Sequence, residues 1–396
     1  MRTNIQSPLA QTAAGAIADE VLRACVHCGM CNATCPTYQL TGDELDGPRG
    51  RIYLIKQALE GEPVGRTTQH HLDRCLSCRA CETTCPSGVE YHRLLDVGRS
   101  VVAERVKRPW PERLFRTTLR AVILHPARLA PLVALARIFT RKIPRAIPPG
   151  AAAKTARFRR MALLDGCVQP ATASHFNAAT RRVFGHIGVG LESTPGVGCC
   201  GALSFHLDAT EEARAHARRN IDAWIRALDA GAEAIIVNAS GCAAFIHDYP
   251  DVLAGDPAYA AKARRVADHV RDPIQILDET PPTALRPPAL PRVAVHEPCT
   301  LQHGARLGGR IGKLLTDLGY DAQPVTDAHL CCGSAGAYSL LQPDFARRLR
   351  ADKLAALTAG GPATIYTANI GCWMHLAETS PVPVRHWIEA VDEVLG

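Results

Sequence analysis

Cysteine spacing constrains this chain more than any other feature of its sequence. Eight of its 16 cysteines stand near the N-terminus in two runs, each with the pattern Cys-x2-Cys-x2-Cys-x3-Cys-Pro. The first run begins at Cys25 and the second at Cys75. At this spacing one tight turn can present three thiols to a common ligand, while the fourth thiol, before a proline that redirects the chain, points elsewhere. The region must therefore fold around whatever these thiols bind.

A disulfide-bonded secreted protein is the first alternative to metal binding. Such scaffolds are usually short and follow a signal peptide. This chain has 396 residues, and residues 1–20 contain one basic residue and no continuous apolar segment, so we expect no export signal. The chain also lacks a run of 18 apolar residues that would predict a transmembrane helix. We therefore expect reduced, metal-bound thiolates in the cytoplasm.

The repeated run predicts two [4Fe–4S] clusters of the ferredoxin type in residues 1–105. Two zinc knuckles are the alternative, but they need only four cysteines each and do not require the repeated, proline-terminated spacing. A helical pattern at 51–60, between the runs, indicates a mostly α-helical module. In two-cluster ferredoxins the fourth cysteine of each run binds the other cluster. The expected ligand sets are Cys25, Cys28, Cys31 and Cys85 for one cluster, and Cys75, Cys78, Cys81 and Cys35 for the other.

Residues 161–396 contain the other eight cysteines as two copies of one pattern. The four cysteines of the first copy return in the second at offsets of 132, 132, 132 and 130 residues. Their neighbourhoods match as well, since CCGALSFHL aligns with CCGSAGAYSLL, and GAEAIIVNASGC with GPATIYTANIGC. We interpret the region as an internal duplication. The candidate metal ligands are Cys167, Cys199, Cys200 and Cys242 in the first copy, and Cys299, Cys331, Cys332 and Cys372 in the second.

Each copy has the pattern of an α/β domain. In the first copy, Ser174 is expected to cap a helix that runs to Val183, and Asp208 to open a helix that runs to about Leu228. The cysteines follow the predicted strands closely, and open α/β sheets bind ligands beyond the carboxyl ends of their strands. Short apolar runs predict the strands at 161–164, 234–237, 293–295 and 364–366.

The predicted fold class is α+β and multidomain: an N-terminal α-helical ferredoxin module with two [4Fe–4S] clusters, followed by two duplicated α/β domains. A proline-rich stretch at 281–291 is the expected linker between the copies. The expected limits are 1–105 for the module, 106–160 for a basic amphipathic linker, 161–285 for the first α/β domain and 286–396 for the second.

The pattern of residues 161–396 resembles that of the cysteine-rich, Cys-Cys-Gly domain family. This family occurs in heterodisulfide reductases, anaerobic glycerol-3-phosphate dehydrogenases and complexes that oxidise lactate or glycolate. The resemblance implies that the four cysteines of each copy converge on an iron–sulfur cluster or, in some copies, on zinc. The fullest family pattern has a fifth cysteine, where this chain has Phe245 and His375. Four thiolates still suffice for a [4Fe–4S] cluster, and buried metal-free thiols are the alternative.

Taken end to end, the chain resembles the family of glycolate oxidase iron–sulfur subunits. The resemblance is carried by RACVHCGMCNATCPTYQLTGDELDGPRGRIYLIKQ, LDRCLSCRACETTCPSGVEYHRLLD and TANIGCWMHL with VRHWIE. It implies an electron-transfer subunit of an oxidoreductase complex, in which an FAD-containing subunit oxidises glycolate to glyoxylate and this subunit passes the electrons on to an acceptor such as quinone. We expect no catalytic residue that acts on the organic substrate and no nucleic-acid partner.

Two other functions remain open. One is a thiol–disulfide redox subunit of the heterodisulfide-reductase type, which the missing fifth cysteines disfavour. The other is the iron–sulfur subunit of a lactate or glycerol-3-phosphate dehydrogenase complex. The segment Gly196–Gly201 also fits the dinucleotide fingerprint G-x-G-x-x-G, but its two cysteines belong to the duplicated pattern, so we interpret it as a metal-binding loop. We expect structural roles for the histidines near the cysteines: His206, His247 and His303.

Positive charge is concentrated in one segment. Twelve Lys and Arg and no Asp or Glu lie between Arg113 and Arg160, so the remaining residues, with 33 basic and 38 acidic side chains, are mildly acidic. The pattern indicates amphipathic helices, with Pro131 in a first turn, and such helices bind anionic membrane surfaces. We expect peripheral attachment to the inner face of the cytoplasmic membrane, with docking to a partner subunit as the alternative. The basic residues expected to face that surface are Arg116, Arg120, Arg137 and Arg141.

Overall fold

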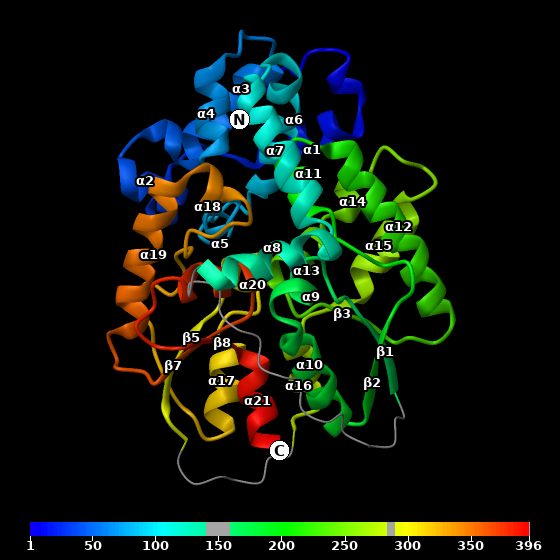
Figure 1. Ribbon diagram of the computed structural model, residues 1–396. Coiled ribbons are helices and arrows are strands. Elements are labelled where there is room, and N and C mark those ends of the chain that lie inside the picture. The colour runs from blue at the N-terminus through cyan, green and yellow to red at the C-terminus, as the bar shows by residue number, and fades with distance from the viewer. Residues whose placement is uncertain (140–158, 283–289, 396) are drawn as a thin grey trace.

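The computed structural model describes residues 1–139, 159–282 and 290–395, and Figure 1 shows their arrangement. A helical N-terminal module lies at one end of the molecule, and two α/β units with one parallel sheet each lie at the other. The predicted fold class, an α-helical module followed by two α/β domains, is confirmed. The expected boundary at 285/286 lies outside the described residues, as do residues 140–158 of the expected linker.

The N-terminal module is built of short helices around the two cysteine runs. They are α1 (Ala13–Ala24), α2 (Pro36–Thr41), α3 (Pro48–Leu59), α4 (Arg66–Asp73), α5 (Ala80–Thr83) and α6 (Tyr91–Arg105), with 3-10 turns η1 (Leu9–Gln11), η2 (Met30–Thr34) and η3 (Glu44–Asp46). Helix α3 contains most of the helix predicted at 51–60 and begins earlier, because Pro48 suits a first helical turn. Buried Leu22, Ile55 and Leu94 join α1, α3 and α6 in one apolar core.

Two helices follow the module, α7 (Trp110–Ile123) and α8 (Pro126–Phe139). The expectation that Pro131 lies in a first turn is wrong, because α8 begins at Pro126 and Pro131 lies inside it. No single helix in the described ranges is long and apolar enough to cross a membrane. Helix α7 and residues 126–136 meet the length and composition criteria only as a pair, which is bent by 97°.

The basic stripe predicted on α7 is largely directed at the protein itself. Arg116 is buried, with ion pairs to Glu112 at 3.2 Å and to Asp208 at 3.3 Å. Arg120 forms an ion pair with Glu212 of the first α/β unit. The expectation that these two arginines face an external surface is therefore wrong. The side chain of Arg137 and all of Arg141 lie outside the described part of the chain.

The first copy forms a four-stranded, all-parallel sheet in the order β2-β1-β3-β4. Its strands are β1 (Arg159–Leu163), β2 (Val189–Ser193), β3 (Ile235–Ile236) and β4 (Val270–Arg271). Its helices are α9 (Gln169–Thr172), α10 (Ser174–His186), α11 (Ala202–His206), α12 (Thr210–Asp229), α13 (Ser240–His247), α14 (Tyr249–Val252), α15 (Ala260–His269) and α16 (Pro273–Glu279). The last three residues of β1 and both residues of β3 are apolar and buried, as parallel strands covered on both faces require.

The second copy repeats this layout, with the all-parallel order β6-β5-β7-β8. Its strands are β5 (Arg292–His296), β6 (Asp321–Gln323), β7 (Thr364–Thr367) and β8 (Val384–His386). Its helices are α17 (Arg310–Asp317), α18 (Tyr338–Leu341), α19 (Pro343–Thr358), α20 (Ile370–Ala377) and α21 (Trp387–Leu395), with a π-turn η4 (Thr300–Gly304). Each strand thus has a counterpart at the same place in the other sheet.

Two predicted helix starts in the first copy are displaced. Ser174 is the first residue of α10 rather than its cap, and Ala173 precedes it without a capping side chain. Asp208 does not open α12, which begins at Thr210. Asp208 instead has a φ of +63°, and its carboxylate accepts a hydrogen bond from Arg108 Nε at 2.7 Å. This contact spans 100 residues of sequence, so local periodicity could not predict it.

The three parts are joined by specific contacts. The copies pack together through α10 and α21 (Figure 1), where Arg182 forms an ion pair with Asp392. The module lies beyond the carboxyl ends of the strands, because Thr83 of α5 is hydrogen-bonded at 2.9 Å to His303 of η4, the turn that follows β5.

Candidate metal centres

The two cysteine runs of the module fold into loops of the same shape. His27 and Gly29 in the first loop have φ of +61° and +86°, and the equivalent Ser77 and Arg79 in the second have φ of +53° and +60°. Left-handed residues reverse the backbone between successive cysteines, so the three thiols of a run can face one cavity. Three of these four residues are not glycine, and such backbone strain persists mainly at functional sites.

The fourth cysteine of each run lies at the loop formed by the other run. Counting space open to solvent, the two cavities measure about 440 and 390 Å³, and Cys81 lines both. The structure therefore groups the thiols as the crossover pattern predicts, while their role as cluster ligands stays a prediction. Site one is lined by Cys25, Cys28, Cys31 and Cys85, and site two by Cys35, Cys75, Cys78 and Cys81.

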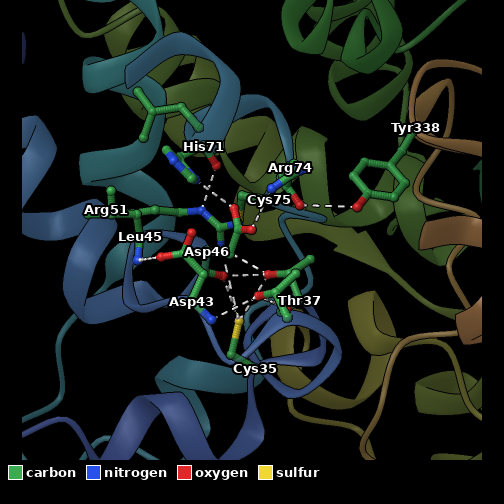
Figure 2. A network of polar contacts seen from close by, with 12 residues as sticks. Cys35, Thr37, Asp43, Leu45, Asp46, Arg51, His71, Arg74, Cys75 and Tyr338 are labelled. Carbon is green, nitrogen blue, oxygen red and sulfur yellow. Dashed lines mark hydrogen bonds and ion pairs between the residues drawn. The ribbon is translucent and has the colours of Figure 1, made fainter. Parts of the chain in front are cut away.

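A buried arginine stands beside site two (Figure 2). Arg51 donates from Nε to the His71 carbonyl at 2.7 Å and from Nη1 to Thr37 Oγ1 at 3.1 Å, and Nη1 reaches Cys35 Sγ at 4.0 Å. Burial works to lower the pKa of Arg51, but the negative charge of Cys75 and of further anionic groups around it raises that pKa. A permanent cation is thus held against the thiols, which suits a site whose ligands carry net negative charge.

Asp46 holds the wall of site two together. Its buried carboxylate lies 2.8 Å from His71 Nδ1 and accepts a hydrogen bond from Arg74 Nη1 at 2.7 Å, and its carbonyl accepts one from Thr37 Oγ1 at 2.6 Å (Figure 2). Asp46 and Arg51 belong to the sequence TYQLTGDELDGPRGRIYLIK. The segment therefore has a physical role, which is to supply a buried cation and a network of hydrogen bonds beside site two.

The glycine after each paired cysteine is required by the backbone. Gly201 and Gly333 have φ of +94° and +88°. An added Cβ would lie 3.0 Å from the Ala213 carbonyl oxygen in the first copy and 2.8 Å from that of Ala346 in the second. Only glycine combines the left-handed conformation with so close an approach to a neighbouring helix. The motif therefore needs a glycine where its loop approaches that helix.

The four thiols of each copy lie together. Cys299 Sγ is 3.9 Å from Cys331 Sγ in the second copy. In the first copy, hydrogen bonds from the Cys167 and Cys200 thiols hold the pKa of Cys199 well below its usual value. The structure brings together all members of both predicted sets: Cys167, Cys199, Cys200 and Cys242, and Cys299, Cys331, Cys332 and Cys372.

These groups fit a metal by their chemistry. Thiolates that are crowded together and buried lose the solvation of their negative charge by water. A bound cation compensates for that loss. Sets of four soft sulfur donors suit an iron–sulfur cluster or zinc. The residues at the missing fifth positions have structural partners instead: Phe245 packs on Phe205 with ring centroids 5.2 Å apart, and His375 Nε2 lies 3.2 Å from the Ala346 carbonyl.

A histidine that sequence analysis missed lies in the second thiol group. The ligand atoms of His296, Cys332 and Cys372 all lie within 4.8 Å of one another, and all three residues are buried. Of the histidines considered earlier, His303 has structural partners, since Nδ1 contacts Thr83 and Nε2 lies 2.9 Å from the His329 carbonyl.

Site two and the second copy share an apolar contact. Leu76, Cys78 and Ala80 of the module pack in one buried cluster with Cys331 and Tyr338 of the second copy. The order in space is therefore site one, site two, and then the thiols of the second copy.

Comparison with known proteins agrees with this division of the chain. A family model described as a 4Fe-4S dicluster domain matches residues 21–89. A second model, described as a cysteine-rich domain, matches twice, at 161–247 and at 293–377. The three matches cover both loops of the module and the cysteine groups of both copies.

Similar sequences are found among bacterial proteins. The glycolate oxidase iron-sulfur subunit of Escherichia coli (strain K12) is 50% identical over 404 residues, covering 100% of this chain and 99% of the relative. The probable glycolate oxidase iron-sulfur subunit of Bacillus subtilis (strain 168) is 29% identical, covering 89% of this chain and 87% of the relative. Lactate utilization protein A of an Exiguobacterium species is 24% identical over 59% of this chain and 97% of its own length.

Proposed function

This chain belongs to the family of glycolate oxidase iron–sulfur subunits, and on that premise we propose that it receives electrons from an FAD-containing subunit that oxidises glycolate to glyoxylate and passes them to quinone. The membership rests on 50% identity over the whole chain. Of the alternatives, the heterodisulfide-reductase type of chemistry is disfavoured by Phe245 and His375, which take the places of the fifth cysteines and have structural partners.

The observation that carries the proposal is the continuity of the thiol groups. Cys81 lines both cavities of the module, and Cys78 of site two packs with Cys331 of the second copy. A bound iron–sulfur cluster supplies storage for one electron at each group. The chain's own residues place Cys78 and Cys331 in one buried apolar cluster, which favours transfer along site one, site two and the second copy in that order.

Oxidation of the organic substrate is assigned to the partner subunit. Both cavities described in the module are lined by cysteines at the spacing of cluster ligands, so we assign the space they enclose to clusters rather than to a hydroxy acid. The chain would act as the electron-transfer part of the complex and have no activity toward glycolate by itself.

The test is turnover with and without the partner. Anaerobically purified chain with its full iron content should reduce no artificial acceptor when glycolate or lactate is added. When the co-purifying flavoprotein is also present, glycolate should bleach the visible cluster absorbance. The mixture should then reduce a quinone analogue. Glycolate oxidation by the isolated chain would contradict the proposal. If lactate but not glycolate bleached the clusters in the presence of the flavoprotein, the chain would belong to a lactate-oxidising complex.

We further propose that the protein is cytoplasmic and attaches to the inner face of the membrane through α7 and α8. Five large apolar side chains of these helices are exposed, although Arg116 and Arg120 are directed inward. Exposed apolar residues beside exposed Arg113 and Arg128 are typical of helices that lie in a membrane interface. The five are Trp110, Leu114, Phe115, Leu132 and Leu135, exposed by 74, 59, 45, 49 and 53%.

Vesicle flotation tests the attachment. Replacing Trp110, Leu114 and Leu132 together with serine should abolish flotation with anionic vesicles, because burial of apolar side chains in the interface supplies much of the binding. Leu340→Ser is the matched control, since Leu340 is 52% exposed on α18 of the second copy and should be neutral. Equal flotation of the triple variant and the control would leave docking to the flavoprotein as the role of this surface.

A further inference from the structure

The two copies differ at one pair of neighbouring positions beside their thiol groups. In the first copy, Leu164 follows β1 and lies next to the segment of Val237, and both are buried. In the second copy the equivalent positions are His296, the last residue of β5, and Thr367, the last residue of β7, which are paired in the sheet. An apolar pair in one copy is thus a polar pair at the equivalent positions of the other.

The polar pair is built to orient an imidazole. His296 Nδ1 lies 2.9 Å from Thr367 Oγ1, and both side chains are buried. This contact uses one ring nitrogen and leaves Nε2 for another partner. Metal-bound histidines have this arrangement, in which the second nitrogen is hydrogen-bonded to a neighbouring group that fixes the ring. Burying an imidazole costs free energy, and the Leu164–Val237 pair of the first copy avoids this cost. We therefore infer that a ligand compensates for it in the second copy.

The ligand atoms nearest to this ring are thiols. The ligand atoms of His296, Cys332 and Cys372 lie within 4.8 Å of one another. Cys299 and Cys331, with sulfurs 3.9 Å apart, belong to the same group. The second copy therefore offers four sulfurs and one nitrogen, where the first copy offers four sulfurs and a leucine.

We propose that His296 is a metal ligand through Nε2, and that the second copy holds an iron–sulfur cluster of mixed cysteine and histidine ligation beside Cys332 and Cys372. His296 would then hold the iron that one of the four thiolates would otherwise hold, and this neutral imidazole in place of an anionic thiolate raises the reduction potential of the cluster. Lys353, a buried cation whose Nζ donates to the Asp327 carbonyl at 2.7 Å, acts in the same direction. The cluster of the second copy would then have a higher potential than its counterpart in the first copy, independently of which substrate feeds the chain.

The test variant carries in the second copy the residues that the first copy has at the equivalent positions. His296→Leu with Thr367→Val recreates in the second copy the apolar pair that the first copy already packs, so the fold should be retained. His375→Gln is the control, because this histidine is also near the thiols but contacts the Ala346 carbonyl. The full-length chain is loaded anaerobically with iron and sulfide, labelled with ¹⁵N-histidine, and reduced stepwise.

Pulsed EPR of the reduced wild-type chain should give the hyperfine coupling of one directly bound histidine nitrogen. The double variant should lose this coupling and one centre should move to lower potential in a redox titration, whereas His375→Gln should retain both properties. Nitrogen coupling that persists in the double variant would overturn the assignment, as would wild-type protein in which all clusters lack it. One equivalent of zinc in place of iron at the second copy would also overturn it.

Discussion

At the scale of single residues, the Cys-Cys-Gly glycines are subject to two separate constraints, a left-handed backbone and a close neighbour. Gly201 and Gly231 both have a φ of +94°. A Cβ at Gly201 would lie 3.0 Å from the Ala213 carbonyl oxygen, whereas a Cβ at Gly231 would meet nothing within 4 Å. The first copy therefore contains its own control for the effect of backbone conformation alone.

We predict that Gly231→Ala lowers the free energy of unfolding by about 1 kcal/mol, the cost of a left-handed alanine. Gly201→Ala should cost roughly 1–3 kcal/mol more, the usual cost of overpacking, because α12 must move away from the paired cysteines. Thermal denaturation gives the difference, and iron analysis should find metal lost only from the Gly201 variant. Equal effects of the two substitutions would mean that the close approach to Ala213 is unimportant.

The residue scale also contains the main omission of sequence reasoning. The cysteines could be assigned to groups because their spacing repeats, but His296 belongs to no spacing motif. Its distinguishing partner, Thr367, lies on another strand, 71 residues away. A comparison of the two copies position by position, with Leu164 and Val237 as the counterparts, would have singled out the pair.

At the scale of elements, α6 is attached to the first copy by partly buried charges. His92 Nδ1 lies 2.8 Å from Glu82, and Nε2 lies 3.5 Å from Asp248, the residue after α13. Arg79 also forms an ion pair with Asp248. Burial works to lower the pKa of His92, but hydrogen bonds to the two carboxylates raise it to about 9. The nearby carboxyl group of Asp96 has its pKa raised to about 6 by burial, so it has already ionised when His92 titrates.

A raised histidine pKa makes stability depend on pH in a defined direction. The contribution of His92 is fully present below the unfolded pKa of about 6.5 and is lost as the pH rises through about 9. We predict that the melting temperature of the wild-type chain falls between pH 7 and pH 9.5 more than that of His92→Gln. The unfolding free energy of the wild-type chain minus that of His92→Gln should fall by roughly 2 kcal/mol between these two pH values. A constant difference between the two proteins would contradict the account.

Helices and strands could be predicted where the sequence signal was local. Predictions failed where a contact with a residue far away in the sequence determines the start of a helix or the direction of a side chain. The inner strands β1, β3, β5 and β7 and helix α3 follow from apolar runs and periodicity, whereas no sequence signal identified the edge strands. The start of α12 and the orientation of the α7 arginines depend on ion pairs of Asp208 and Glu212 with residues 92 to 100 positions away. A charge count along the segment records twelve cations but not the acidic partners that pair with four of them in the described residues: Arg116, Arg120, Arg159 and Arg160.

At the scale of the whole molecule, one arrangement accounts for the order of the domains in the sequence. The module lies across the strand ends of both copies (Figure 1), where their cysteines collect. The duplication of the α/β units was predictable from cysteine offsets, and their equal sheet order agrees with it. Which copy adjoins site two was not predictable, because it depends on packing of Leu76 and Cys78 against Cys331 and Tyr338.

The central claim, that two clusters are held by crossed ligand sets and begin the electron path, is tested most directly by four single serine variants compared by EPR. Cys85→Ser should lose the same signal as Cys28→Ser, since both thiols line site one, and Cys35→Ser should lose the same signal as Cys78→Ser, since both line site two. If Cys85→Ser instead matches Cys78→Ser, each run binds its own cluster and the account is contradicted.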